Sequence, residues 1–157
     1  MEHLEIERKF LVKSNAFKVD STLDIKIIQG FLNTHPERTV RVRLKGEEAF
    51  LTVKGIGNDS GTTRFEWETQ ITPSEAINLI DLCEPGILEK VRYHVPVGKH
   101  VYEVDEFLRE NKGLIVAEIE LQHEDEVFEK PDWLGKEVTG DVKYYNSQLS
   151  KNPYSNW

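Results

Sequence analysis

The stretch EIERKF, residues 5–10, sets a charged side chain at every second position. In a β-strand, successive side chains point to opposite faces, so Glu5, Glu7 and Lys9 are predicted to share one face. Their Cα atoms would lie about 6.5–7 Å apart, so two carboxylates and one ammonium aim at the same region. Like charges held this close repel each other, which favours a site that contains both cations and anions over a solvated strand face.

The same spacing recurs farther along the chain. The acidic pairs two residues apart are Glu66 and Glu68, Glu103 and Asp105, and Glu118 and Glu120. The basic pairs are Arg41 and Arg43, and Lys90 and Arg92, and the set is extended by Lys54 and Arg64. One such pair is usually a solvated face. Repetition on several segments instead indicates one concave site lined by both signs of charge.

Composition limits the classes of protein that need to be considered. The chain has 157 residues, a length typical of one domain, so residues 1–157 are taken as a single domain. A net charge of −8 disfavours nucleic acid as a partner, and no apolar run is long enough to span a bilayer. The single cysteine, Cys83, excludes an internal disulfide, and the expected location is the cytoplasm.

Segments with period-two alternation dominate the chain and predict eight strands. They lie near residues 3–12, 24–33, 38–45, 48–55, 63–71, 88–95, 100–107 and 114–123. Short turn sequences between several of them favour antiparallel hairpins. A helix is predicted from Thr72, where Pro73 and Glu75 complete a capping box, and a shorter one over 141–150. The fold class is therefore α+β, mainly antiparallel β, with a few flanking helices.

Closing eight antiparallel strands into a barrel would turn one face of every strand inward. Unpaired buried charges cost several kcal/mol each, so an interior of carboxylates, guanidinium and ammonium groups must also hold water, metal or ligand. Mg²⁺ and Mn²⁺ prefer carboxylate oxygens, and phosphate oxygens prefer arginine and lysine. We therefore expect a metal–phosphate pocket inside the barrel, with Ile6 and Phe10 packed on its outside.

With these residues described, the chain resembles the CYTH superfamily, the triphosphate tunnel metalloenzymes, whose hallmark is an N-terminal E-x-E-x-K strand. Glu5, Glu7 and Lys9 match this motif. Further matching strings occur in the order of the family, namely QGFL at 29–32, RVRL at 41–44, LTVKG at 51–55, FEWETQI at 65–71, EKVRY at 89–93, EVDEF at 103–107, AEIEL at 117–121 and YYNSQL at 144–149. The resemblance implies a closed eight-stranded tunnel that binds a linear triphosphate and needs a divalent metal, Mg²⁺ or Mn²⁺.

The resemblance also implies roles for individual residues. The phosphate-binding positions it predicts are Lys9, Arg41, Arg43, Lys54, Lys90 and Arg92. The metal-binding positions are Glu5, Glu7, Asp105, Glu118 and Glu120, and the less firmly assigned wall residues are Arg64, Glu66, Glu68 and Glu103. Lys90 and Glu120 are predicted to be catalytic, Lys90 through proton transfer or stabilisation of the leaving group. The chain departs from the family at Phe31, where a tyrosine is common.

The function expected from these features is metal-dependent hydrolysis of a triphosphate, most simply inorganic triphosphate to pyrophosphate and phosphate. The same tunnel is compatible with a class IV adenylate cyclase, or with a nucleoside or thiamine triphosphatase. From other classes, a non-catalytic polyphosphate- or nucleotide-binding barrel and a restriction-type nuclease are alternatives. The nuclease is disfavoured because the acidic chain lacks a concentrated basic face outside the tunnel. A homodimer is an oligomeric state that the sequence leaves open.

Overall fold

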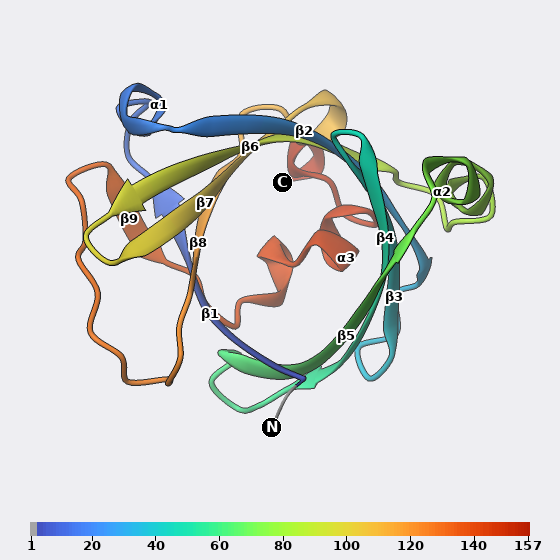
Figure 1. Cartoon of the computed structure of the whole chain (residues 1–157), viewed down its shortest axis with the longest axis horizontal. Coiled ribbons are helices and arrows are strands. Elements are labelled where there is room, and N and C mark those ends of the chain that lie inside the picture. The colour runs from blue at the N-terminus through green and yellow to red at the C-terminus, as the bar shows by residue number, and fades with distance from the viewer. Residues whose placement is uncertain (1–2) are drawn as a thin grey trace.

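The computed structural model of the chain describes residues 3–157, so the first two residues of the predicted domain lie outside the described part. Eight antiparallel strands form the wall of a closed barrel, seen along its axis in Figure 1. They are β1 (Leu4–Val12), β2 (Leu23–Asn33), β3 (Thr39–Lys45), β4 (Glu48–Gly57), β5 (Thr63–Ile71), β6 (Leu88–Val97), β7 (His100–Phe107) and β8 (Ile115–Glu120). The predicted number, direction and approximate bounds of the eight strands are confirmed.

The strand order around the wall is β5-β4-β3-β2-β6-β7-β8-β1, and β1 pairs back with β5. This closing seam is short: Leu4 pairs with Phe65, Glu5 with Arg64 and Ile6 with Thr63. Antiparallel pairing of sequential strands through hairpins accounts for most of the wall. Because the wall is closed, the alternate side chains of every strand face a common interior.

A ninth strand, β9 (Leu134–Glu137), pairs with the outer end of β1 and was not predicted from the sequence. Its four residues, LGKE, show no apolar alternation and include a glycine, which weakens strand propensity. The pairing with β1 therefore comes from tertiary contact. After β9 the chain continues into the segment that follows residue 138.

The helix predicted from Thr72 is confirmed as α2 (Pro73–Ile80) with its capping box. The Glu75 amide donates to Thr72 Oγ1 at 3.1 Å, and the Thr72 amide donates to Glu75 Oε1 at 2.9 Å. Three other short helices are α1 (Phe17–Asp20), η1 (Arg109–Asn111) and η3 (Tyr154–Asn156).

The single helix predicted over 141–150 is wrong. The chain instead forms η2 (Val142–Tyr144) and α3 (Asn146–Leu149), separated by Tyr145 in an extended conformation with φ −68° and ψ 135°. Asp141 does cap the first turn, accepting from the Lys143 amide at 3.2 Å. The extended residue turns the chain at Tyr145, and the two short helices lie within the outline of the barrel in Figure 1.

Much of the apolar core lies on the outer face of the barrel wall, whereas a second cluster joins Phe31 on β2 to Leu149 on α3 within the barrel. Phe10 is buried on the outer face with Val104, Ala117 and Ile119, under a cover that includes Trp133 and Phe17. Ile6 packs against the same cluster, so the predicted outward packing of Ile6 and Phe10 is confirmed. Since burial of such side chains stabilises the fold by about 1.5–3 kcal/mol each, the outer face supports a wall whose inner face is charged. Between residues 3 and 157, no helix has the length and apolar character needed to cross a membrane.

Candidate active site

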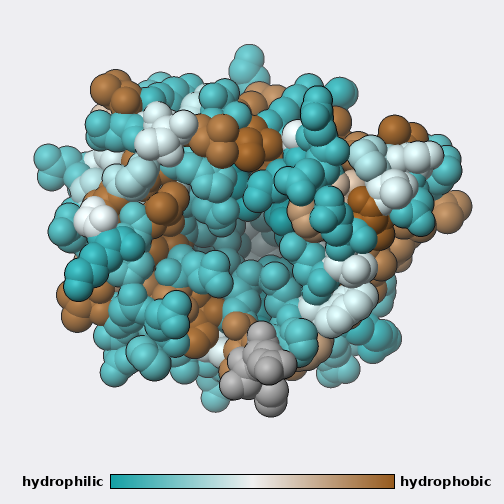
Figure 2. Space-filling view, viewed as in Figure 1, coloured by the Kyte–Doolittle hydropathy of each residue, from teal (hydrophilic) through white to brown (hydrophobic). Residues whose placement is uncertain are grey.

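A cavity of about 220 Å³ runs inside the barrel. Figure 2 shows it as a central hollow surrounded by hydrophilic side chains. Among the predicted site residues, those that line it are Glu5, Glu7, Lys9, Arg41, Arg43, Lys54, Lys90, Arg92, Glu118 and Glu120. The four predicted wall residues, Arg64, Glu66, Glu68 and Glu103, line it as well. The period-two spacing of the strands therefore brings the predicted charges into one cavity, with Asp105 as the exception.

The two signs of charge are concentrated on opposite parts of the wall. Lys54 lies on β4, Arg41 and Arg43 lie on β3, and Lys90 and Arg92 lie on β6, while β2 between β3 and β6 adds no charge to the described lining. The adjacent strands β7, β8, β1 and β5 carry Glu103, Glu118, Glu120, Glu5, Glu7, Glu66 and Glu68. Among the described residues that line the cavity, Lys9 on β1 and Arg64 on β5 are the cations on these acidic strands. This arrangement can hold a polyanion on one side and cations on the other.

The arginines of β3 have fewer acceptors than donors. Arg41 and Arg43 lie 3.5 and 3.6 Å from Glu68 Oε2, while Thr52 donates to the same oxygen at 2.6 Å. Within the described residues, Arg41 Nε and Arg43 Nε are buried without an acceptor. Burial lowers the pKa of Arg43 to about 10, and the neighbouring guanidinium groups add to the effect. An anion in the cavity would supply the missing compensation.

Asp105 is held inside the wall and is absent from the cavity lining. Its Oδ1 accepts from Arg92 Nε at 2.8 Å, and its Oδ2 accepts from Arg92 Nη2 at 3.0 Å and lies 2.8 Å from Lys90 Nζ. Burial opposes its ionisation, but Arg92 and Lys90 lower the pKa of Asp105. Because both oxygens are occupied by cations, this geometry does not favour the predicted role of Asp105 as a metal ligand.

Lys90 is the most deeply buried cation of the site. Burial lowers the pKa of its ammonium to about 8, even though Asp105 beside it favours the charged form. Besides Asp105, its Nζ donates to Asn146 Oδ1 at 2.9 Å. An ammonium with a pKa near neutrality can both neutralise charge and exchange a proton, which fits the predicted catalytic role.

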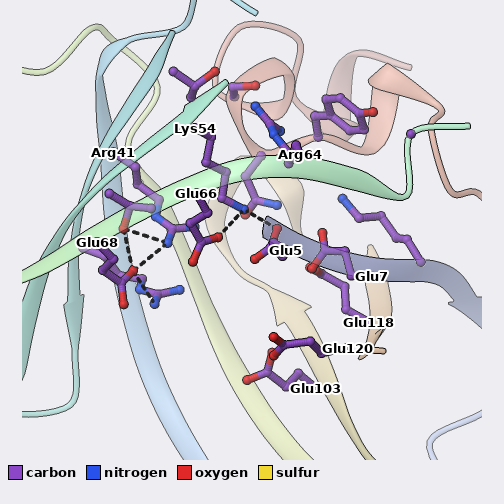
Figure 3. Close-up of a pocket in the computed structure, with 18 of the residues that line it drawn as sticks. Glu5, Glu7, Arg41, Lys54, Arg64, Glu66, Glu68, Glu103, Glu118 and Glu120 are labelled. Carbon is purple, nitrogen blue, oxygen red and sulfur yellow. Dashed lines mark hydrogen bonds and ion pairs between the residues drawn. The ribbon is translucent and has the colours of Figure 1, made fainter. Parts of the chain in front are cut away.

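On the acidic side, two pairs of carboxylates lie close together, and one member of each pair has a raised pKa. Burial, and then repulsion by Glu118, raise the pKa of Glu7 well above its ordinary value. Burial and a hydrogen bond to Glu5 raise the pKa of Glu66 to about 7. Lys54 Nζ lies 2.9 Å from Glu5 and 3.2 Å from Glu66, as the dashed lines in Figure 3 show.

The donor chemistry of this side suits a hard divalent cation. Figure 3 shows Glu7 and Glu118 side by side, with Glu120 below them. Burial and the charges of Glu5 and Glu103 raise the pKa of Glu120. Carboxylates that take up protons to relieve mutual repulsion would be better compensated by a cation. Within residues 3–157, however, no three such groups converge closely enough to hold a metal ion, so the ligand set stays a prediction.

The C-terminal part of the chain contributes cavity residues that were not predicted from the sequence. We call residues 139–150 the C-terminal strap; its lining residues are Thr139, Gly140, Tyr145, Asn146 and Ser147. Lys9 Nζ lies 5.1 Å from the centre of the Tyr145 ring, within cation–π range. The string YYNSQL was matched to the family but interpreted as one helix, which hid the inward direction of Tyr145. Phe31 also lines the cavity, so the departure from tyrosine lies inside the site.

Comparisons with known proteins agree with this arrangement. The model of the CYTH domain matches residues 3–151. An inorganic triphosphatase of Acetivibrio thermocellus is 46% identical over 154 residues, covering 98% of this chain and 97% of the relative. An inorganic triphosphatase of Nitrosomonas europaea is 36% identical over 151 residues, covering 93% and 96%. The solved structure of the inorganic triphosphatase NE1496 matches with a TM-score of 0.66 at 33% identity, covering 93% of this chain and 97% of that chain.

Proposed function

Because the chain belongs to the CYTH domain family, we propose that it hydrolyses inorganic triphosphate to pyrophosphate and phosphate with the help of a divalent metal. The observation that carries the proposal is the full-length similarity to two inorganic triphosphatases, joined to a tunnel whose basic and acidic walls face each other. We also propose that the chain acts as one domain, since the family match leaves only short ends outside it.

In this proposal the basic residues of β3, β4 and β6 bind the phosphate chain. Arg41, Arg43 and Lys54 provide charged donors on β3 and β4, and Arg92 and Lys90 provide them on β6. Lys9 reaches the same cavity from β1. Fixed donors of this kind stabilise charge that develops on the transferred phosphoryl group and on the leaving pyrophosphate. Asp105 is assigned a positioning role, because it holds Arg92 and Lys90 in place.

On the acidic wall, Glu5, Glu7, Glu118 and Glu120 are proposed to hold Mg²⁺ or Mn²⁺. When bound, the metal would neutralise phosphate oxygens and lower the pKa of a coordinated water. The support is the chemistry of the donors: burial and repulsion by Glu118 raise the pKa of Glu7, and a bound cation would compensate both carboxylates. Of these four residues, Glu120 combines a raised pKa with an exposed position, which suits the proposed catalytic role.

Lys90 is proposed to stabilise the leaving group and to move a proton. Its Nζ is fixed by Asp105 and Asn146 at hydrogen-bond distance. With a pKa of about 8, it is mostly charged at neutral pH and still able to release a proton. In this step the water oxygen bonds to the transferred phosphorus and the water loses a proton to solvent, while the bond to the leaving pyrophosphate breaks and its oxygen takes the proton of Lys90. Lys90 then regains a proton from solvent, so one water cleaves one phosphoanhydride bond.

A substrate screen tests the proposal. Purified protein would be given inorganic triphosphate, ATP, GTP, thiamine triphosphate or long polyphosphate with Mg²⁺ or Mn²⁺, and released phosphate would be measured. We expect the highest kcat/KM for inorganic triphosphate, and loss of turnover in Glu5→Gln with the fold retained. Faster formation of pyrophosphate and cyclic AMP from ATP would instead assign a cyclase. Binding without turnover under either metal would assign a non-catalytic barrel. Location in the cytoplasm and a homodimer stay predictions.

A further inference from the structure

The C-terminal strap lines one part of the tunnel and contacts the barrel closely near both of its ends. At its start, a Cβ added to Gly61 in the β4–β5 turn would lie 2.4 Å from Gly140 Cα, so the two backbones touch. At its end, a Cβ added to Gly86 would lie 1.8 Å from the Ser150 carbonyl oxygen. Both contacts exclude side chains. The strap is therefore seated on the barrel by its backbone, and its central residues face the cavity.

The side chain of Asn146 is oriented by two buried donors. Its Oδ1 accepts from Lys90 Nζ at 2.9 Å and from Gln29 Nε2 at 2.8 Å. Lys90 is 1% exposed and Gln29 is fully buried, so neither donor is free to turn to solvent. An ammonium only donates hydrogen bonds, so the atom of Asn146 that faces Lys90 must be the oxygen. The amide nitrogen then points away from this contact.

In the described part of the chain, Asn146 Nδ2 has no hydrogen-bond partner, while Asn146 itself lines the cavity. The residue thus presents an N–H donor at the end of the tunnel beside Lys90. Lys9 and Arg64 lie near the same end, against the ring of Tyr145 at 5.1 and 6.0 Å. A hydrogen-bond donor placed among cations can bind a phosphate oxygen, whereas it cannot bind a cation.

We infer that Asn146 recognises the terminal phosphoryl group of the substrate through its Nδ2, while its Oδ1 keeps Lys90 in position. The inference rests on the proposed function. In it, the strap forms the end wall of the phosphate-binding site. The wall is made by the C-terminal segment, so it is separate from the barrel strands that supply the charged residues. Asn146 would then act on substrate directly and through Lys90 at once.

Two substitutions separate these roles. Asn146→Asp keeps an oxygen acceptor for Lys90 and Gln29 but replaces the N–H donor with an anionic oxygen facing the phosphate. Asn146→Ala removes both the acceptor and the donor. Asn152→Asp is the matched control, because it adds the same charge just beyond the strap at an exposed position outside the cavity lining. Circular dichroism and thermal melting would verify that each variant is folded.

Binding of inorganic triphosphate would be measured by calorimetry in EDTA, and KM with Mg²⁺ by phosphate release. We expect Asn146→Asp to weaken binding and raise KM about tenfold or more, at least as strongly as Asn146→Ala, with Asn152→Asp unchanged. Wild-type affinity in Asn146→Asp with a defect confined to Asn146→Ala would reduce Asn146 to a structural support for Lys90 and overturn the inference. Equal weakening in Asn152→Asp would overturn it as well.

The two levels of the proposal fail in different ways. If the wild-type protein binds triphosphate in EDTA but hydrolyses nothing, the proposed hydrolysis fails and recognition by Asn146 is still tested by calorimetry. If the wild-type protein hydrolyses triphosphate and Asn146→Asp does so with an unchanged KM, only the inference about Asn146 fails.

Discussion

The ammonium of Lys90 and the carboxylate of Asp105 lie 2.8 Å apart, from Nζ to Oδ2, and each side chain is only 2% exposed. Asp105 also accepts two hydrogen bonds from Arg92, so one buried anion serves two buried cations. The group of three keeps one net positive charge. That excess is what a phosphate chain would neutralise, and the ion pairs fix where it lies.

Removing the anion of this group should destabilise the protein. In Asp105→Asn, Lys90 and Arg92 would remain buried without their carboxylate, and removal of one partner of a buried pair costs about 3–5 kcal/mol. Urea denaturation of Asp105→Asn measures this loss. Asp125→Asn, at an exposed loop position, is the matched control and should be near neutral. Equal free energies of unfolding for the two variants would show that the buried group contributes nothing to stability.

Glu7→Gln should raise stability while it removes activity. The amide cannot ionise, so the cost of burying a charge at this position and the repulsion by Glu118, which together raise the pKa of Glu7, disappear. The metal-free variant should therefore melt higher than the wild type at pH 8, and its Mg²⁺-dependent turnover should fall at least tenfold. Melting in EDTA and phosphate release would be measured on the same preparation. Wild-type turnover in Glu7→Gln would remove this residue from the proposed metal site.

The metal-free protein should lose stability as the pH rises from about 6 to 8, a window in which the carboxylates with a lowered pKa, such as Glu118, are ionised in both the folded and the unfolded state. The pKa of Glu66 is raised to about 7 and that of Glu7 is raised well above 4.5, so the folded state binds more protons than the unfolded state in this window. The stabilisation is complete below the unfolded pKa and is lost as the pH passes the folded one. We expect a loss of roughly 1–2 kcal/mol.

Urea denaturation in EDTA at several pH values between about 6 and 8 measures this slope. Addition of Mg²⁺ should flatten it, because a bound cation lets the carboxylates ionise without repulsion. The lowered pKa of Lys90, about 8, acts in the opposite sense only above that pH. A free energy of unfolding that is constant or rises from about pH 6 to 8 in EDTA would contradict the raised pKa of Glu66 and Glu7.

Much of the site could be predicted because strands have a period of two. The spacing alone places Glu5, Glu7 and Lys9 on one face, and closure of the barrel turns this face inward. The capping box at Thr72 was equally local, since its two hydrogen bonds join residues three apart. Such features depend on neighbouring residues and so are visible in the sequence.

Features that depend on pairing between distant segments were not predicted. The spacing places Asp105 on the inward face, but only the register of β6 with β7 sets it opposite Arg92 and turns it into a partner of cations. β9 forms because β1 is available beside it. The extended conformation of Tyr145, which divides the predicted helix, is supported by contacts of the strap with the barrel rather than by local propensity.

The seat of the strap gives a further prediction. Gly86 has φ +99° and no room for a Cβ beside Ser150, whereas Gly46 has φ +60° and its nearest neighbour at 3.6 Å. Alanine at either position adopts a left-handed conformation, at a cost of about 1–2 kcal/mol, but only Gly86→Ala also collides with the backbone. Gly86→Ala should therefore unfold at a lower urea concentration than Gly46→Ala, and trypsin should cleave it faster than Gly46→Ala at Lys143 or Lys151. Equal behaviour of the two variants would mean that the strap is not held at this point.

The central claim is that the tunnel hydrolyses inorganic triphosphate, and the most direct measurement is ³¹P NMR of the products. Purified protein with inorganic triphosphate and Mg²⁺ should yield one pyrophosphate and one phosphate per substrate consumed. The reaction should stop in EDTA and in Glu5→Gln. Persistence of the triphosphate signals with both Mg²⁺ and Mn²⁺, by a protein shown to be folded, would contradict the account.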